Sequence, residues 1–500
     1  MTKQERLVLV VSILAAGVAF LDGAIVNVAL PAIQDNLGGG LATQQWVVDA
    51  YLLTLGSFIL LAGSVSDIFG RIKVLKLGLL GFGAASLLCA FAPSAEVLIL
   101  ARALQGIAGA FLVPSSLALI IAAFTGSAQS KAIGTWTAWT GIAFIIGPLL
   151  GGILIDQANW RWIFAINVFP ITLTLMLIKN ITMLRDNKTK TRLDLLGASL
   201  CVAALGSTVF ALIEQPKYGW SDPRIYITFV IGLALLCSFI IYEGKAAHPM
   251  LKLSLFKSRN FSAGNLATFF IYAGLGSTTF LVVLFLQQVL NYSALAAGLS
   301  LLPITIIMFI FSPLFGKLSG KFGPRLFMGL GPLVAALGVF LLGMIDSLNR
   351  DLLNILPGVL IFGFGLSITV APLTSAVLSG APKENAGIAS AINNAIARIA
   401  GLIAVALIGA IVANAFMSNI EKQTTELTSG LKSDLKQSTI QSDPPKPYQK
   451  DLALKDILRK SSQTAYQVGA NASAMLIATG GVLSLVFIQN KQNKQTPSKS

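Results

Sequence analysis

The chain has 500 residues, of which 55% are hydrophobic and only 11% are charged, and its formal net charge is +15. A soluble domain carries about 25% charged residues, so this composition excludes an ordinary soluble protein. The apolar runs are continuous and roughly 20 residues long, whereas the strands of a membrane barrel alternate over about 10 residues. The sequence therefore predicts an all-α polytopic membrane protein, embedded in the lipid bilayer.

Fourteen apolar runs are long enough to cross the membrane. They lie at residues 7–30, 45–66, 74–93, 96–122, 133–155, 162–183, 195–214, 225–243, 262–288, 295–316, 326–345, 352–379, 387–412 and 467–489. If the N terminus is placed inside, the inner segments hold 22 Lys and Arg residues and the short outer loops hold 4. This contrast predicts that both termini are cytoplasmic and that the protein lies in the cell membrane.

Residues 413–466 are predicted to form one long outer loop, because they are polar and contain the turn-forming run SDPPKPY. Leu427, Leu431 and Leu435 recur at helical spacing, so an amphipathic helix is the alternative. We favour a solvated loop.

The stretch GSVSDIFGRIK (Gly63–Lys73) lies between the second and third spans. Gly63 is expected to let two helix backbones approach closely, and Asp67 to favour a neighbouring helix N-terminus. Gly70 permits the positive φ that a tight reversal needs. Arg71 is a cation at the membrane edge, as expected on the cytoplasmic side.

A weaker copy of this stretch, GKLSGKFGPR, occupies residues 316–325. The copy indicates an internal duplication that aligns spans 1–6 with spans 9–14 and leaves spans 7 and 8 as an inserted pair. Duplicated bundles of this kind place the substrate site near the bilayer midplane, between the halves. The predicted units are an N-terminal bundle (1–184), a linker with the inserted pair (185–257), a C-terminal bundle (258–490) and a tail (491–500).

Four ionisable residues lie inside apolar runs: Asp22, Asp49, Arg102 and Arg398. Each costs about 2.5–3.5 kcal/mol at a helix centre on insertion scales, and such residues are usually functional or paired. A carboxyl group in a low-dielectric cavity can load and unload a proton, and a fixed cation that moves toward or away from it switches its charge. Asp22 and Arg102 are therefore either a proton switch or a static buried ion pair that fixes packing.

Other polar residues in the spans are weaker candidates. Gln105 lies three residues after Arg102 and shares its face. Asp49 is a proton carrier, a gate, a substrate contact or an outer-interface residue. Asn394 and Arg398 share a face of span 13, where they either line a cavity or tie helices together.

Several aromatic residues and one amide are further candidates for a substrate cavity. Aromatic side chains that face a cavity suit flat, lipophilic or cationic ligands, although aromatic side chains that face lipid or core are commoner. These candidates are Asn27, Trp136, Trp139, Phe269 and Tyr272.

The run GPLLGG in span 5 predicts a close and kinked helix contact. Small residues at this spacing allow helix backbones to approach, and a proline interrupts the helical hydrogen bonds. Such a contact can seal one side of a pathway. The run comprises Gly147, Pro148, Leu149, Leu150, Gly151 and Gly152.

Together these motifs resemble the fourteen-span drug:proton antiporter branch of the major facilitator superfamily. The resemblance covers nearly the whole membrane part, and the order and spacing of the motifs are more specific than any one of them. The stretches that carry it are LDGAIVNVALP (Leu21–Pro31), GSVSDIFGRIK, ARALQGIAGA (Ala101–Ala110), GPLLGG, WRWIFAINVF (Trp160–Phe169) and HPMLKLSLFKSRNF (His248–Phe261).

The resemblance implies roles for the matching residues. Asp22 would be a proton-coupling carboxylate and Arg102 its partner. Asp67, Gly70 and Arg71 would act in a conformational latch, and Gly147, Pro148, Gly151 and Gly152 would form the antiporter hinge. Ile68 stands where the loop usually carries a base, and Gly320 replaces the acid of the second loop, so any latch is asymmetric.

The leading functional hypothesis is proton-coupled efflux of small lipophilic, neutral or monocationic compounds by alternating access. The alternative is an exporter of an endogenous lipid, siderophore or metabolite on the same fold, and a non-transporting sensor is less favoured. A membrane-embedded enzyme is disfavoured because the single histidine, His248, and the three scattered cysteines cannot form a metal site or a triad. We expect no cofactor, no nucleic-acid partner and a monomer.

Overall fold

The computed structural model describes residues 1–181, 193–348, 351–382, 385–423, 435 and 451–490, apart from a few side chains, that of Asp67 among them. The described residues form helices, turns and bends, without a strand. Within them, thirteen helices are long and apolar enough to cross a membrane, and a shorter apolar stretch spans Trp162–Ile178. The predicted all-α membrane fold is confirmed.

The first predicted bundle contains five long helices followed by two short ones. The sixth predicted span is split: α6 and α7 are separated by Ile166 and Asn167, which keep near-helical dihedral angles. The helices are α1 (Lys3–Leu37), α2 (Leu41–Phe69), α3 (Arg71–Ala90), α4 (Ala95–Ala123), α5 (Gly126–Gln157), α6 (Trp162–Ala165) and α7 (Val168–Ile178).

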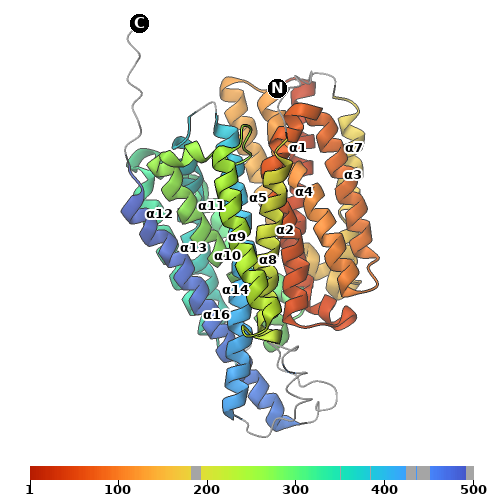
Figure 1. Cartoon of the computed structure of the whole chain (residues 1–500), viewed down its shortest axis with the longest axis vertical. Helices are drawn as coiled ribbons and strands as arrows, with labels where there is room; N and C mark the ends of the chain where they lie inside the picture. Colours follow the sequence, from red (N-terminus) through yellow and green to blue (C-terminus); the bar gives the residue numbers. More distant parts are fainter. Residues whose placement is uncertain (182–192, 349–350, 383–384, 424–434, 436–450, 491–500) are drawn as a thin grey trace.

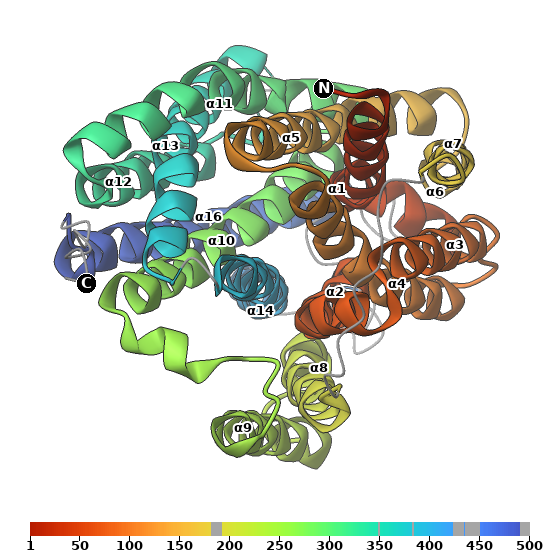
Figure 2. The ribbon, with the colours of Figure 1, turned by 90° about the horizontal axis from the view of Figure 1, so that it is seen from above.

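The remaining helices comprise a peripheral pair and a second bundle. The pair, α8 (Leu195–Tyr218) and α9 (Pro223–Lys245), lies at the edge of the molecule, where α8 contacts both α2 and α14 (Figure 2). A 3₁₀ turn, η1 (Leu253–Lys257), leads into the second bundle. That bundle contains α10 (Arg259–Leu284), its π-helical continuation η2 (Phe285–Val289), α11 (Ala294–Phe322), α12 (Pro324–Gly343), α13 (Leu352–Ser379), α14 (Ala386–Gln423) and α16 (Leu452–Phe487).

The molecule has two sides, one at each end of the long helices (Figure 1). The terminal side is the side where α1 begins and α16 ends, and the hairpin side is the side from which α14 and α16 protrude. The prediction of a solvated loop over 413–466 is wrong at both of its ends, because α14 continues to Gln423 and α16 begins at Leu452.

These extensions are helical because they bury apolar side chains. Phe416, Ile420, Leu454 and Leu458 belong to the core, and the ring of Tyr466 stacks on Phe285 with 3.9 Å between ring centroids. Of the three leucines that suggested a helix, Leu435 is buried, whereas Leu427 and Leu431 lie outside the described residues.

The repeated glycine stretches adopt the same backbone geometry. Gly70 (φ 97°) ends α2 and begins α3, and Gly323 (φ 86°) ends α11 and begins α12. Each donates its N–H to the carbonyl four residues earlier, that of Ser66 or Ser319. The positive φ expected at Gly70 is confirmed. The close helix approach expected at Gly63 is wrong in this conformation, because a Cβ added there meets no atom within 4 Å.

These two glycines give a matched pair of substitutions. Gly70→Ala should lower the free energy of unfolding by about 1–3 kcal/mol, because a side chain is strained at this positive φ. Gly63→Ala should be neutral or slightly stabilising, because alanine favours a helix and the space is open. Thermal unfolding in detergent measures both changes, and equal losses of stability would contradict the assignment.

Candidate functional site

The carboxylate of Asp22 on α1 is fully buried and accepts hydrogen bonds from three side chains. Its Oδ2 accepts a bond from Nη1 of Arg102 at 2.6 Å. Its Oδ1 accepts bonds from Nε2 of Gln105 and from Nδ2 of Asn167, both at 2.9 Å. The three donors together satisfy both oxygens of the Asp22 side chain.

Arg102 on α4 is 1% exposed and is itself held on several sides. Its Nε donates to the carbonyl of Val47 on α2 at 3.1 Å, and its Nη1 also donates to Oε1 of Gln105 at 2.7 Å. Its guanidinium lies 4.2 Å from the ring centre of Tyr51. Gln105 in turn donates to Oγ of Ser86 on α3 at 2.9 Å. Four helices and the break between α6 and α7 therefore meet at this one charge pair.

Asn167 and Ser86 were not predicted from the sequence to belong to this network. Asn167 lies in the apolar stretch WRWIFAINVF, and a single amide in such a stretch is the feature that could have identified it. It is the N-cap residue of α7, directly before Val168, and its amide donates to Asp22 at 2.9 Å and to Oγ of Ser86 at 3.4 Å. Nothing in the sequence distinguishes Ser86, because serines are common in membrane helices and usually bond to their own backbone.

Asp49 has the opposite environment from Asp22. It is fully buried, and neither carboxylate oxygen has a hydrogen-bond partner among the described residues. Gln45, one turn earlier on α2, donates to the carbonyl of Val405 on α14 at 2.7 Å. A Cβ at Gly56, two turns later, would lie 3.6 Å from Cβ of Arg398. Helical periodicity therefore places Asp49 on the face of α2 that packs against α14 of the other bundle.

The polar residues of span 13 divide between two roles. Asn394 is exposed and donates to the carbonyl of Ser390 in its own helix at 2.9 Å, so it ties no helices together. The tie is made by Asn393, whose amide donates to Asn265 at 3.1 Å and to Thr268 at 2.8 Å, both on α10.

Arg398 and Asn27 were the other polar candidates for the cavity. The guanidinium of Arg398 lies 5.5 Å from the ring centre of Phe20 on α1 and so reaches across to the first bundle. Asn27 donates to the carbonyl of Gly23 in its own helix at 3.3 Å.

The aromatic candidates do not form one surface. Trp136 is buried in a core made by the first bundle and donates from Nε1 to the carbonyl of Ser12 at 3.2 Å, so the cavity interpretation of Trp136 is wrong in this conformation. Trp139 is exposed. Phe269 and Tyr272 on α10 pack against a small apolar cluster shared with α14.

The GPLLGG run makes the close contacts that its small residues predict. A Cβ at Gly147 would lie 2.8 Å from Cβ of Ala24 on α1, and one at Gly151 would lie 2.7 Å from Ile25. On the other flank, a Cβ at Gly152 would overlap the backbone of Leu295 on α11. The run therefore joins α5 both to α1 and to the second bundle.

Further contacts close the hairpin side between the bundles. Both oxygens of Asp156, near the end of α5, accept N–H groups from the first turn of α11, those of Ala294 at 3.2 Å and Leu295 at 3.0 Å. Gln288 donates to Oε1 of Gln34 on α1 at 3.0 Å.

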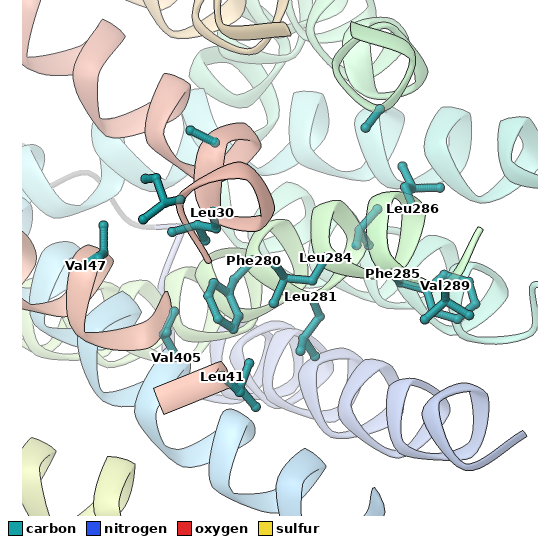
Figure 3. Close-up of a cluster of buried hydrophobic side chains, with 14 of the residues drawn as sticks. Leu30, Leu41, Val47, Phe280, Leu281, Leu284, Phe285, Leu286, Val289 and Val405 are labelled. Atoms are coloured by element: carbon teal, nitrogen blue, oxygen red, sulfur yellow. The ribbon is translucent and has the colours of Figure 1, made fainter. Parts of the chain in front are cut away.

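An apolar cluster at the same end contains side chains of both bundles (Figure 3). Leu30 and Val47 of the first bundle meet Phe280, Leu284 and Val405 of the second. By contrast, the cluster around Val8 and Trp136 contains residues of the first bundle alone. The hairpin side is therefore sealed by side chains from both halves.

The predicted latch is described only in part. Nη1 of Arg71 donates to the carbonyl of Ala118 on α4 at 3.4 Å. The side chain of Asp67 lies outside the described residues. Gly70 provides the turn between α2 and α3, as noted above.

Many apolar helices in two bundles, with a buried charge pair inside one bundle and a seal between the bundles, define a multi-pass membrane transporter. The sequence model of the Major Facilitator Superfamily matches residues 12–405. The multidrug resistance protein Stp of Mycobacterium tuberculosis is 34% identical over 428 residues, which cover 84% of this chain and 78% of that protein.

Two further comparisons agree. The puromycin resistance protein pur8 of Streptomyces alboniger is 34% identical over 409 residues, covering 81% of each chain. The crystal structure of a bacterial homologue of the human lysosomal transporter Spinster, inward-facing and unoccupied, superimposes with a TM-score of 0.61 at 16% identity, covering 98% of this chain and 99% of that one. The chain belongs to the major facilitator superfamily and is a transporter, not an enzyme.

Asn167 offers a direct test of the hydrogen bonds around Asp22. Asn167→Ala removes one donor from a buried carboxylate and should lower the free energy of unfolding by about 1–3 kcal/mol. Asn394→Ala is the matched control, because that amide is exposed and bonds only within its own helix turn. Thermal unfolding of the two variants in detergent should separate them, and an unaffected Asn167→Ala would show that its bond to Asp22 contributes nothing.

Proposed function

We propose that this protein is a proton-coupled exporter of small lipophilic compounds, neutral or monocationic, that works by alternating access. The observation that carries the proposal is the buried Asp22–Arg102 pair inside a bundle whose partner bundle closes over it at one end. The relatives named for multidrug and puromycin resistance support drugs as the substrate class. The proposal places both termini in the cytoplasm, so the closed hairpin side is the outer side, and it takes a monomer as the working unit.

Asp22 is the proposed proton carrier, and its position on α1 suggests how protonation would act on the seal. Ala24 and Ile25, two and three residues after Asp22, are the residues that contact Gly147 and Gly151 of α5. A proton on Asp22 would remove the charge that Arg102, Gln105 and Asn167 hold in place. The segment of α1 that supports α5 at the outer side would then be free to shift.

Asp49 is the second proposed proton carrier. A charged carboxylate at its site would have no compensating donor among the described residues, so the neutral acid is the form that this conformation accommodates. Its place on the α2–α14 face ties its protonation to the contact between bundles. In this conformation Asp22 thus has three side-chain donors while Asp49 has none among the described residues, and separation of α2 from α14 would expose Asp49 to solvent.

The first test measures transport driven by a pH gradient. Purified protein in liposomes with an imposed pH gradient should move a fluorescent monocation such as ethidium, and Asp22→Asn should abolish gradient-driven movement while retaining dye binding. Asp35→Asn is the control, because Asp35 lies on the same helix but is exposed. Unchanged driven transport in Asp22→Asn would refute Asp22 as a carrier and favour Asp49. No dye transport by folded wild type would favour an endogenous metabolite as the substrate.

A second test examines the outer seal. Gly152→Val should force α5 away from the backbone of α11 and lower the population of the closed state. Gly134→Val on the same helix is the control, because an added Cβ there meets no atom within 4 Å. The readout is cross-linking of Gln34→Cys to Gln288→Cys by a short bismaleimide, at two positions whose glutamine side chains hydrogen-bond to each other at 3.0 Å, in a chain whose three native cysteines are changed to serine.

Cross-linking should be fast in the parent and in Gly134→Val and several-fold slower in Gly152→Val. Equal rates in all three proteins would show that the GPLLGG contact does not hold the outer side closed.

A further inference from the structure

A second pair of buried carboxyl groups lies on the inserted helices, away from the site around Asp22. Asp194 is the N-cap residue of α8, and Glu243 lies in the last turn of α9, so both are at the terminal side. Asp194 is 7% exposed and Glu243 is 2% exposed. Acidic side chains are almost never buried to this extent unless they are paired.

Each carboxyl group uses one oxygen and leaves the other without a donor. Oδ1 of Asp194 accepts the N–H of Gly197 at 2.8 Å and the hydroxyl of Tyr242 at 3.0 Å. Oε2 of Glu243 accepts the N–H of Leu251 at 3.0 Å. Oδ2 of Asp194 and Oε1 of Glu243 are buried and have no hydrogen-bond partner among the described residues.

The two unpartnered oxygens point into the same space. A Cβ added at Gly197 would lie 2.6 Å from Oδ2 of Asp194 and 2.6 Å from Oε1 of Glu243, so the oxygens lie within twice that distance of each other. The two carboxyl groups are within hydrogen-bonding reach once one of them carries a proton. Glycine at position 197 therefore leaves room for both carboxyl groups beside the first turn of α8.

Among the described residues, the groups that surround the pair supply no positive charge. The thiol of Cys201 on α8 lies near Glu243, and the phenol of Tyr242 already donates to Asp194. Lys252 is directed to the amide of Asn385 at 3.4 Å. Two unpaired charges at this spacing would repel each other in a low-dielectric site.

A bound proton satisfies the two unpartnered carboxyl oxygens better than a metal ion would. Ca²⁺ takes six to eight oxygen ligands, and Mg²⁺ demands octahedral geometry. Only two oxygens are unpartnered here among the described residues, and the others already accept N–H or O–H groups. One proton placed between the two oxygens satisfies both, since the protonated carboxyl donates and the carboxylate accepts.

We propose that Asp194 and Glu243 form a further proton-binding site, separate from Asp22 and Asp49, in which one proton is shared between Oδ2 and Oε1. The bound proton fastens the segment 246–257 to the inserted helices, because Glu243 holds that segment through the N–H of Leu251. When the proton leaves to the solvent on the terminal side, two like charges face each other, Glu243 moves away, and the N–H of Leu251 is released.

The segment connects the inserted helices to the second bundle. Leu251 and Leu255 pack in an apolar cluster with residues of α8, α9, α10 and α14. Directly after the segment, Nε of Arg259 donates to the carbonyl of Phe487 at 3.0 Å and Nδ2 of Asn260 donates to the carbonyl of Gln489 at 3.0 Å, at the end of α16. The proton therefore controls how firmly α8 and α9 are held to the terminal side of the second bundle.

Hydrogen exchange of the full-length protein in nanodiscs tests the proposal. Exchange in peptides covering 246–257, corrected for the intrinsic effect of pH, should rise about tenfold or more between about pH 6 and pH 9 in wild type. Glu243→Gln and Asp194→Asn each supply a permanent N–H donor to the opposite oxygen. Both variants should therefore stay protected at high pH.

Two controls keep both carboxyl groups. Tyr242→Phe removes only a hydrogen bond to Asp194, and Asp222→Asn changes a partly exposed carboxylate that pairs with Arg224 at the other end of α9. Both should retain the pH response of wild type. Asp22→Asn should also retain it while losing driven transport, so failure of this proposal and failure of the proposed export function are distinguishable.

Three outcomes would overturn the proposal. The first is exchange in 246–257 that does not respond to pH in wild type. The second is a pH response that survives in both Glu243→Gln and Asp194→Asn. The third is saturable protection of wild type at high pH by added Na⁺ or Ca²⁺ that both variants lose, which would make this a metal-ion site.

Discussion

The structure of the first bundle depends on satisfying one carboxylate inside the membrane. Asp22 is fully buried, and its three donors come from α4 and from the break between α6 and α7, with Ser86 of α3 and Val47 of α2 holding those donors in turn. Breaking a buried ion pair costs about 3–5 kcal/mol, because the remaining charge is left uncompensated. The helices of this bundle are therefore fixed in rotation by polar contacts as well as by apolar packing.

The same constraint reaches the sixth span. Asn167, between α6 and α7, is fully buried against Asp22, and its backbone keeps near-helical dihedral angles. The amide therefore reaches the carboxylate from an almost continuous helix. The sequence contains this amide in an otherwise apolar stretch, but its partner lies 145 residues away along the chain. Local patterns cannot reveal that pairing.

The membrane helices and the repeated turns could be predicted from the sequence, because both follow from local physics. Backbone polar groups in lipid must be satisfied within a segment, so long apolar runs are helical, and a reversal at positive φ requires glycine at Gly70 and Gly323. The helical extensions of α14 and α16 could not be predicted in the same way. Their sequence is polar and typical of a loop. Their helical form depends on tertiary contacts such as that between Phe285 and Tyr466.

In the candidate site, too, the environment of a buried acid could not be predicted from the local sequence. Asp22 and Asp49 look alike in sequence, each a lone acid in an apolar run, yet one has three side-chain donors and the other has none. Asp194 and Glu243 lie at the ends of apolar runs, where a sequence reading treats acids as ordinary boundary residues. What separates these four residues is the set of donors that other helices bring to them.

Proton coupling in a transporter needs an acid whose environment changes when the seal between the bundles opens. Asp22 meets this requirement indirectly, because its donors all lie in its own bundle while the adjacent residues of α1 support α5. Asp49 meets it directly, because the α2–α14 contact that encloses it is itself part of the junction between bundles. A proton on Asp49 is therefore compatible with the closed junction, and loss of that proton favours separation of α2 from α14, where water can solvate the carboxylate. The two proposed carriers thus respond to different parts of the same movement. Asp22 responds to release of its ion pair with Arg102, and Asp49 responds to exposure of the interface between α2 and α14.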